Sequence, residues 1–321
     1  MITDDRCPVS IHPATSDEVE VAARIYQAAA HELHDRLRAS NPWANIEARQ
    51  EDLQHARRAL RALVAGDGGA LVIARDPHGE PVGMAAVMVH PPHAHLAFLF
   101  VMPDRQNQGI GRALLEAVSR HIDTFGVTAI TLASSRDPKA WHRYLRWGLR
   151  PGPPQLPFRA AHPIFPLHMA EHSVLHHRPI VASDLETLIA LDRPVRGGDR
   201  SARIAAWLAT GSTGELVFDR ATGEPRGYAL VHLNEWFGQI GPVVALDRLD
   251  FPMVLDVALV AAGRIPNPDF LPWRADCSAR NHLAVDPLLA AGFTLEAIVN
   301  WFETGPVGQW DHYLFRDEDE L

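Results

Sequence analysis

The chain has 321 residues, 47% of them hydrophobic, and a formal net charge of -9 at pH 7, which predicts two domains with packed cores. The negative charge argues against a nucleic-acid partner bound through its phosphates, and no apolar run is long enough to cross a membrane. Two cysteines in different halves, Cys7 and Cys277, and an acidic N-terminus without a secretion signal predict a reducing, cytoplasmic location.

The first part of the chain predicts two helices and then strands. Thr15-Ser-Asp-Glu18 has the spacing of a capping box, and a helix follows it as far as the break at Asn41-Pro-Trp43. The elements expected next are a second helix over about Ile46–Val64 and two strands over Ala70–Ala74 and Val82–Val89.

A glycine-containing loop follows the next apolar strand. The strand is Leu96–Phe100, the loop contains Gln106-Asn-Gln-Gly109-Ile-Gly111, and a helix is predicted from Ala113 to Val118. Glycines just before a helix let the backbone approach a ligand with its N–H groups exposed, and the helix N-terminus adds partial positive charge. The segment therefore predicts a cradle for a pyrophosphate.

Three interpretations of this loop compete at first. A dinucleotide-binding loop requires a third glycine, but Arg112-Ala-Leu follows Gly111. A kinase-type P-loop requires Gly-Lys-Ser/Thr, whereas the sole lysine of the chain, Lys139, lies far along the sequence. A plain glycine turn between strand and helix is the third.

The whole segment from the apolar strand to Leu115 closely resembles the acetyl-CoA-binding motif of the GCN5-related N-acetyltransferase (GNAT) superfamily. The resemblance implies acetyl-CoA as the cosubstrate, and no metal is expected. It also implies that the backbone of Phe100 and Val101, at a splayed strand end, binds the pantetheine arm. The residues whose amides are implied to hold the CoA pyrophosphate are Gln106, Asn107, Gln108, Gly109, Ile110, Gly111 and Arg112.

A second motif lies downstream, after the predicted strand Thr128–Ala133. The segment from Asp137 to Leu149 resembles the family's Asn-x-x-Ala-x-x-x-Tyr-x-x-x-Gly-Phe element, with Asp137 in place of the cofactor-binding Asn and Leu149 in place of Phe. Tyr144 falls on the position of the family's general acid. A phenol with a pKa of about 10 stays protonated at neutral pH and can donate to the departing sulfur. An amphipathic core tyrosine is the alternative.

The general base is less clearly marked. His95 is predicted to alternate with Ala97 and Leu99 on one strand face, and a histidine titrates near neutrality. His93 and a chain of ordered water are alternatives. Metal binding by His90, His93 and His95 is disfavoured because they lack helix-face spacing and have no cysteine or acidic ligand nearby.

The second half repeats the first. Arg178–Glu186 mirrors Ser10–Glu18 as strand, cap and helix start, and Asn281–Phe293 parallels the helix of Tyr144. Alignment of the halves places Pro252 and Val254 at the glycine positions and Leu288 at that of Tyr144, and a proline has no N–H for a phosphate. The second copy is therefore predicted to be catalytically silent. A mycothiol-type tandem acetyltransferase is disfavoured, because there the working copy is expected in the second half.

These observations predict an α+β chain of two tandem GNAT-fold domains, each a mixed, mostly antiparallel central sheet flanked by helices. Residues 1–172 form the catalytic domain, with its last strands near Phe158–Ala160 and Leu167–Ala170, and residues 173–321 form the degenerate one. The predicted activity is N-acyltransfer from an acyl-CoA, foremost acetyl-CoA, to a primary amine in a ternary complex. A small-molecule acceptor is preferred over a protein, and a monomer or homodimer without nucleic-acid or membrane partners is expected. The alternative is a non-catalytic CoA-binding sensor or interaction module.

Overall fold

The structure, a computed structural model, describes residues 9–40, 49–65, 68–167 and 174–316. It divides into two compact units. The first is Met1–Arg150 together with Phe302–Gly305, and the second is Pro151–Trp301 together with Pro306–Leu321. The first unit thus ends before the predicted boundary at residue 172 and contains a short segment from the far end of the chain.

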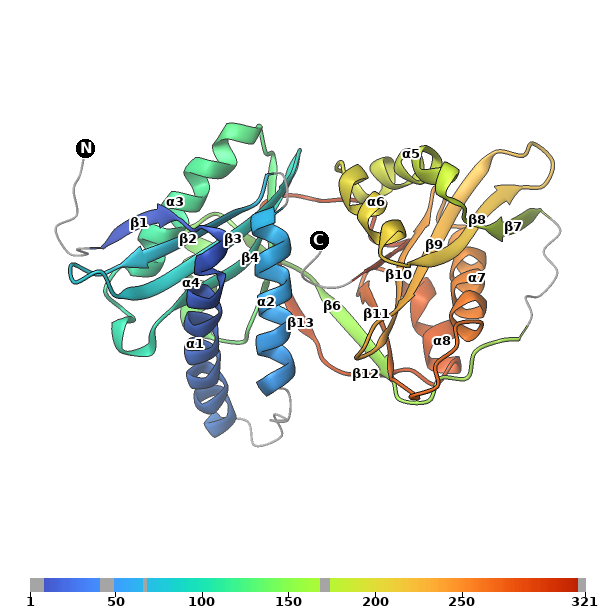
Figure 1. Cartoon of the computed structure of the whole chain (residues 1–321). Coiled ribbons are helices and arrows are strands. Elements are labelled where there is room, and N and C mark those ends of the chain that lie inside the picture. The colour runs from blue at the N-terminus through green and yellow to red at the C-terminus, as the bar shows by residue number, and fades with distance from the viewer. Residues whose placement is uncertain (1–8, 41–48, 66–67, 168–173, 317–321) are drawn as a thin grey trace. The chain divides into compact units, whose positions relative to one another are not determined.

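The first unit contains the predicted succession of one strand, two helices, three strands, a helix, a strand and a helix (Figure 1). Its sheet has the order β1-β2-β3-β4-β5, with antiparallel neighbours except for β4 and β5, which are parallel. The predicted break at Asn41 and the helix start at Ile46 lie outside the described residues. The elements are β1 (Ser10–Pro13), α1 (Val19–Ser40), α2 (Arg49–Ala65), β2 (Ala70–Arg75), β3 (Pro81–His90), β4 (His93–Val101), α3 (Ile110–Ile122), β5 (Ala129–Ser134) and α4 (Pro138–Arg146).

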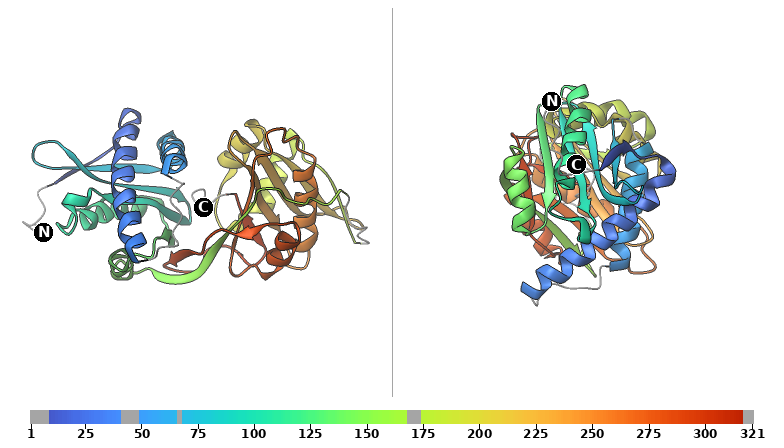
Figure 2. Two further views of the ribbon diagram at one scale, coloured as in Figure 1. Left: turned by 90° about the horizontal axis from the view of Figure 1, so that it is seen from below. Right: turned by 90° about the vertical axis from the view of Figure 1, so that its left-hand side faces the viewer.

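Helices cover both faces of this sheet (Figures 1 and 2). Successive residues of a strand point to opposite faces, so Val72 packs toward α3 while Ile73 packs toward α1 and α2. The helices present apolar stripes with helical spacing to these faces. Val19, Ala22, Ala23 and Ile25 of α1 are buried on one side, and Ile110, Leu114, Leu115, Val118 and Ile122 of α3 on the other.

The first unit is completed by residues that follow almost the whole second half of the chain. The strand β13 (Val299–Glu303) carries Phe302 into the first unit, where its side chain is fully buried. Just after it, the Thr304 N–H donates to the Ile130 carbonyl at 2.9 Å, and the Ile130 N–H donates to Thr304 Oγ1 at 2.9 Å. The Phe302 segment therefore lies along β5.

The segment predicted to end the first domain belongs instead to the second unit. The strand β6 (Arg150–Ala160) is antiparallel to β11 (Trp273–Ser278), with Ala160 opposite Trp273 and Phe158 opposite Ala275. Phe158 and Ala160 are buried in the core of the second unit, which is why this strand pairs there. Of the strand predicted at Leu167–Ala170, residues 168–170 lie outside the described residues.

The second unit repeats the order of elements of the first. Its sheet has the order β7-β8-β9-β10-β14-β11-β6, and β12 (Thr294–Leu295) pairs with β6. Helix α7 is buried along most of its length, so its apolar residues do not form a single stripe. The elements are β7 (Leu175–Pro179), α5 (Leu185–Arg196), α6 (Ser201–Ala209), β8 (Thr213–Asp219), β9 (Pro225–Leu233), β10 (Gly238–Ala245), α7 (Phe251–Gly263), α8 (His282–Ala290) and β14 (Tyr313–Phe315).

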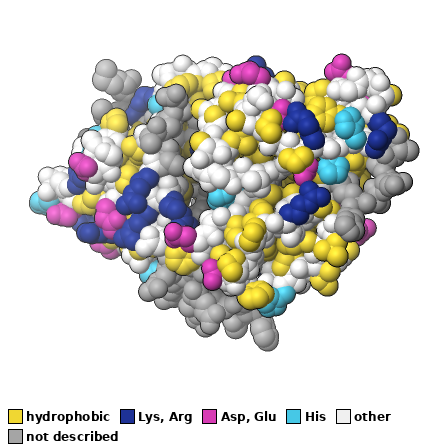
Figure 3. Space-filling model, turned by 45° about the vertical axis from the view of Figure 1, so that its right-hand side comes forward, with side chains coloured by type: hydrophobic (Ala, Val, Ile, Leu, Met, Phe, Trp, Pro, Cys, Tyr) yellow, Lys and Arg dark blue, Asp and Glu magenta, His cyan; other side chains and the backbone are white. Residues whose placement is uncertain are grey.

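Charged and hydrophobic side chains are mixed on the surface. On the face shown in Figure 3, basic and acidic side chains are interspersed with hydrophobic ones. None of the helices in the described residues has the length and apolar character needed to cross a membrane. Cys277 is a buried free thiol, and Cys7 lies outside the described residues.

Candidate functional site

The site begins where two parallel strands separate. β4 and β5 pair only over His93–His95 and Ala129–Thr131. Beyond these residues β4 continues to Val101 paired with β3 but not with β5. A β-bulge in the β3–β4 pair, between Ala86 and Val87, interrupts the alternation of β4. The gap between β4 and β5 thus exposes a strand edge of the kind that the resemblance implies for the pantetheine arm.

The glycine loop has the geometry of an anion cradle. Asn107 and Gly109 both have left-handed backbones, with φ of 64° and 85°, and α3 begins at the next residue, Ile110. The Arg112 N–H donates to the Gly109 carbonyl at 2.9 Å, so the N–H groups before it are the unsatisfied donors of a helix N-terminus. Those donors and the helix dipole together favour a bound phosphate.

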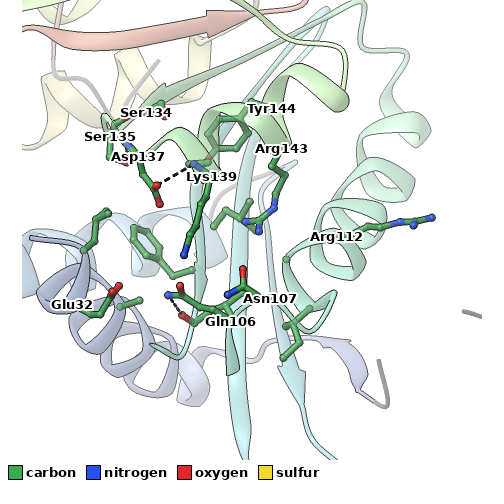
Figure 4. A pocket seen from close by; sticks show the side chains of 18 of the residues that line it. Glu32, Gln106, Asn107, Arg112, Ser134, Ser135, Asp137, Lys139, Arg143 and Tyr144 are labelled. Carbon is green, nitrogen blue, oxygen red and sulfur yellow. Dashed lines mark hydrogen bonds between the residues drawn. The ribbon is translucent and has the colours of Figure 1, made fainter. Parts of the chain in front are cut away.

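The gap, the loop and two helices enclose one pocket of about 220 Å³ (Figure 4). Of the residues predicted from the sequence, Gln108 and His95 do not belong to its lining within the described part of the chain. The predicted residues that line it are Phe100, Val101, Gln106, Asn107, Gly109, Ile110, Gly111, Arg112, Asp137 and Tyr144.

Tyr144 lies on α4 at the wall of this pocket. Its side chain is 9% exposed, and burial raises the pKa of its phenol to about 12. The ring contacts Phe302, with 5.7 Å between ring centroids, so the segment from the end of the chain holds it from behind. The phenol is therefore protonated at neutral pH, and Tyr144 belongs to the lining of the pocket.

Asp137 caps α4 and also bonds to α1. Its carboxylate accepts from the Lys139 N–H at 3.0 Å and from Arg36 Nη2 and Nη1 at 2.9 and 3.3 Å. Burial raises the pKa of this carboxyl, but the hydrogen bonds from Arg36 and Lys139 outweigh burial and hold the pKa below its usual value. Asp137 therefore remains ionised and joins the two helices on either side of the pocket.

The profile of the acetyltransferase (GNAT) family matches residues 30–149, which carry the strand gap, the loop and Tyr144. This part of the chain is a GNAT domain. No curated protein sequence matches the chain.

Known structures agree with two such domains in tandem. A proposed acetyltransferase from Pyrococcus horikoshii is similar, with 18% identity, a TM-score of 0.64, and coverage of 95% of this chain and 93% of the other. A GCN5-related N-acetyltransferase from Sphaerobacter thermophilus has 14% identity, a TM-score of 0.60, and coverage of 94% and 96%. A tandem GNAT protein from the clavulanic acid biosynthesis pathway has 15% identity, a TM-score of 0.56, and coverage of 93% and 99%. At these identities the likeness establishes the fold, a pair of GNAT-like domains.

The predicted base lies outside the pocket of the GNAT domain. His95 is 3% exposed, and its Nδ1 is hydrogen-bonded to Thr131 Oγ1 at 2.9 Å. The expected alternation with Leu99 is wrong, because the bulge intervenes: His95 lies opposite Met88 on the α1 face, whereas Leu99 packs on the α3 face. Among the described residues, no group of three or more His, Cys, Asp or Glu is placed to hold a metal ion.

Five charged residues of the pocket were missed in the sequence. Arg105 precedes the glycine loop, Glu32 and Arg36 come from α1, and Lys139 and Arg143 come from α4. Glu32 Oε1 accepts from Arg36 Nε at 3.0 Å, while its Oε2 is buried with no hydrogen-bond partner among the described atoms. Each pair is spaced i, i+4 and so shares a helix face, which is the only sequence signal that could have marked them.

The corresponding gap of the second unit is filled. β10 and β11 are parallel over Gly238–Ile240 and Trp273–Ala275, and then β14 enters between them. Leu314 of β14 lies opposite Val243 on one side and Cys277 on the other. A segment of the protein thus occupies the place that is a pocket in the GNAT domain.

Further contacts fix β14 in that gap. Asn281, which precedes α8 as Asp137 precedes α4, donates through Nδ2 to the Tyr313 carbonyl at 3.1 Å. Arg200 Nη2 donates to the Tyr313 hydroxyl at 2.7 Å and is also bonded to the buried Asp192. The residues aligned with the two loop glycines, Pro252 and Val254, lie within α7, so no glycine loop precedes this helix.

Proposed function

We propose that the chain is an acyl-CoA-dependent N-acyltransferase, with acetyl as the foremost acyl group, and that its GNAT domain alone is catalytic. The observation that carries this proposal is one pocket that joins an exposed strand edge, a helix N-terminus with unsatisfied N–H groups, and the buried phenol of Tyr144. The acceptor is a primary amine, and a small molecule is favoured over a protein.

In the proposed reaction the amine nitrogen attacks the thioester carbonyl in a ternary complex. The C–N bond forms, the C–S bond breaks, and the backbone N–H of Val101 polarises the carbonyl. Tyr144 gives its proton to the departing sulfur. Glu32, instead of His95, is the proposed base that accepts the proton of the amine, because the Oε2 atom of Glu32 has no hydrogen-bond partner among the described atoms and Glu32 lines the pocket.

The first experiment is a calorimetric titration of the protein with acetyl-CoA. One site per chain is expected, and it should be lost in Gly111→Pro, because proline removes an N–H of the cradle. Two sites would show that the second unit is also a working copy. Absence of binding to acetyl-CoA, CoA and longer acyl-CoAs would overturn the proposal. Binding without turnover over a broad amine panel would favour a CoA-binding sensor.

The acid and the base can be tested together on a reactive amine from the panel. Tyr144→Phe and Glu32→Gln should each lower turnover by about 100-fold or more, since each removes a proton-transfer group. Affinity for acetyl-CoA should stay within about twofold, because neither change removes a phosphate contact. Unchanged turnover in Glu32→Gln would mean that ordered water, and not Glu32, accepts the proton of the amine. Unchanged turnover in Tyr144→Phe would remove Tyr144 from the mechanism.

A further inference from the structure

We infer that Lys139 and Arg143 form a cationic wall that binds the diphosphate of the acyl-CoA from the side opposite the glycine loop. The inference rests on the proposed function, because it concerns the same pocket. It assigns to α4 the positive charge that the loop itself does not supply.

Most basic residues of the pocket already have carboxylate partners. Gln106, the first residue of the glycine loop, carries no charge, and its Nε2 donates to the Val101 carbonyl at 3.4 Å. The Arg112 side chain points away from the pocket in Figure 4. The paired cations are Arg36 with Asp137 at 2.9 Å, Arg105 with Asp76 at 3.2 Å, and Arg112 with Glu116 at 2.8 Å.

Lys139 and Arg143 differ from these three. Within the described residues, neither has a carboxylate oxygen within the 4.0 Å of an ion pair, although both line the pocket. They are one helical turn apart, where like charges destabilise a helix. Lys139 also lies in the first turn of α4, where the helix dipole disfavours a cation. A bound anion would offset both of these unfavourable interactions.

The two side chains face the loop. A Cβ atom at Gly111 would lie 2.9 Å from Arg143 Nη1 and 3.0 Å from Arg143 Cζ, so the guanidinium rests directly on the loop backbone. Figure 4 shows the Lys139 side chain extending across the pocket toward Gln106 and Asn107. An anion cradled by the loop amides would therefore be in contact with α4 on its other side.

The chemistry fits a diphosphate diester. Two phosphate groups linked by one oxygen carry two negative charges, and the wall presents two positive ones. The guanidinium can bind one phosphate through two N–H groups, and the ammonium acts as a point charge on the other. Glycine is then required at position 111 for two reasons. It lets the phosphate approach the backbone, and it leaves room for the Arg143 side chain.

The test compares three ligands by calorimetry with the full chain. CoA has both the diphosphate and a 3′-phosphate, 3′-dephospho-CoA keeps only the diphosphate, and pantetheine has neither. Lys139→Gln should weaken CoA and 3′-dephospho-CoA alike, by about tenfold, and leave pantetheine unchanged. Lys139→Arg keeps the charge and should stay within about twofold of the wild type. The double variant Lys139→Gln/Arg143→Gln should lose about 100-fold with the first two ligands.

The outcomes separate this inference from the proposed function. If the wild type binds none of the three ligands, the proposed function fails. If it binds CoA and the loss in Lys139→Gln appears with CoA but not with 3′-dephospho-CoA, Lys139 binds the 3′-phosphate and the inference is overturned. An equal loss with pantetheine would also overturn it, because the effect would then be one of shape and not of charge.

A second measurement uses the fact that Lys139 is the sole lysine in the sequence. An amine-specific acetylating reagent should modify it readily, because Lys139 is exposed and lines the pocket. Saturating 3′-dephospho-CoA should slow this modification severalfold, and pantetheine should not. Equal labelling rates with and without 3′-dephospho-CoA, in protein shown by calorimetry to be saturated, would contradict the inference.

Discussion

The gap between the parallel strands differs between the two units. In the first, β4 and β5 separate after Thr131 and enclose a pocket that reaches the N-terminus of α3. In the second, β10 and β11 separate after Ala275, and β14 lies between them, paired with both. The pantetheine arm of CoA and a β-strand both carry amide groups. The backbone of β14 can therefore form the hydrogen bonds with the strand edges of the gap that such an arm would otherwise form.

The difference shows that a repeated fold does not imply a repeated site. Both units have the same order of elements, and both have an acidic or amide side chain at the start of the helix after the gap, Asp137 in one and Asn281 in the other. The second unit lacks the glycine loop and has Leu288 in place of Tyr144. Absence of the glycine loop and closure of the gap thus occur together in the second unit.

The largest effect is expected from removing the Phe302 ring, which packs behind Tyr144. Phe302→Ala should lower the free energy of unfolding by about 3–5 kcal/mol, because the ring is fully buried against Trp141 and Tyr144. It should also lower turnover, since Tyr144 loses its support. Urea denaturation measures the first effect, and Phe302→Leu is the control that keeps most of the volume. A stable and fully active Phe302→Ala protein would show that Tyr144 does not need Phe302 for its position.

The next effect concerns the closed gap. Leu314→Ala should cost about 2–5 kcal/mol, because Leu314 is fully buried and removing its methyl groups leaves a cavity. The number of acetyl-CoA sites should remain one, since the second unit has no loop to hold the phosphates. Leu314→Met, which conserves volume, should cost less than about 1.5 kcal/mol. A second site in Leu314→Ala would mean that β14 is a removable cover over a competent pocket.

A matched pair of substitutions compares the two helix starts directly. Asn281→Ala should lower stability by about 1–3 kcal/mol, because it leaves the buried Tyr313 carbonyl without its donor, and acetyl-CoA affinity should not change. Asp137→Ala should lower stability by about 1 kcal/mol through loss of the cap, and acetyl-CoA affinity should also fall. Thermal unfolding and calorimetry together measure both. If the two variants behave alike toward acetyl-CoA, the equivalent positions do not differ in function.

The smallest effect tests a feature that the two units share. Glu18 accepts from Arg75 at 2.8 Å and from the Thr15 N–H at 3.0 Å, and Asp184 accepts from Arg178 at 2.7 Å and from the Val181 N–H at 2.8 Å. The side-chain hydrogen bond from Arg75, with that of the Thr15 amide, lowers the pKa of Glu18 to about 2. The bond from Arg178 lowers the pKa of Asp184 in the same way.

A carboxyl whose folded pKa is depressed stabilises the fold above its unfolded pKa, and this contribution is lost as the pH falls to the folded pKa. For Glu18 that window runs from 4.5 down to about 2. Glu18→Gln should therefore cost about 1 kcal/mol at pH 7 and nearly nothing at pH 2. Asp184→Asn should show the same direction of change. A cost independent of pH would mean that shape, not charge, matters at these caps.

The fold of each half could be predicted because its signals are local. The capping box of Thr15 and Glu18, the glycine loop and the spacing from Asp137 to Tyr144 each act within a few residues, and the structure has the elements that they predict. The pocket also contains most of the residues predicted for it.

What could not be predicted depends on contacts between distant residues. The alternation of apolar residues in β6 shows which face is buried but not which strand is its neighbour, so its pairing with β11 was missed. The bulge that separates Leu99 from the face of His95 arises from the register with β3, which a single sequence does not encode visibly. Lys139 and Arg143 could not be recognised as pocket residues, because their position depends on how α4 lies over the loop.

The position of Phe302 in the sequence has a consequence for biosynthesis. Translation delivers Arg150 first and Phe302 only about 150 residues later, which at about 5–20 residues per second is a delay of roughly 8–30 s. During that interval the nascent GNAT domain has Tyr144 but not the ring that packs behind it. Residues as far as Phe302 must therefore be synthesised before Tyr144 can be held in place, and a product terminated before Phe302 lacks the ring that packs behind Tyr144.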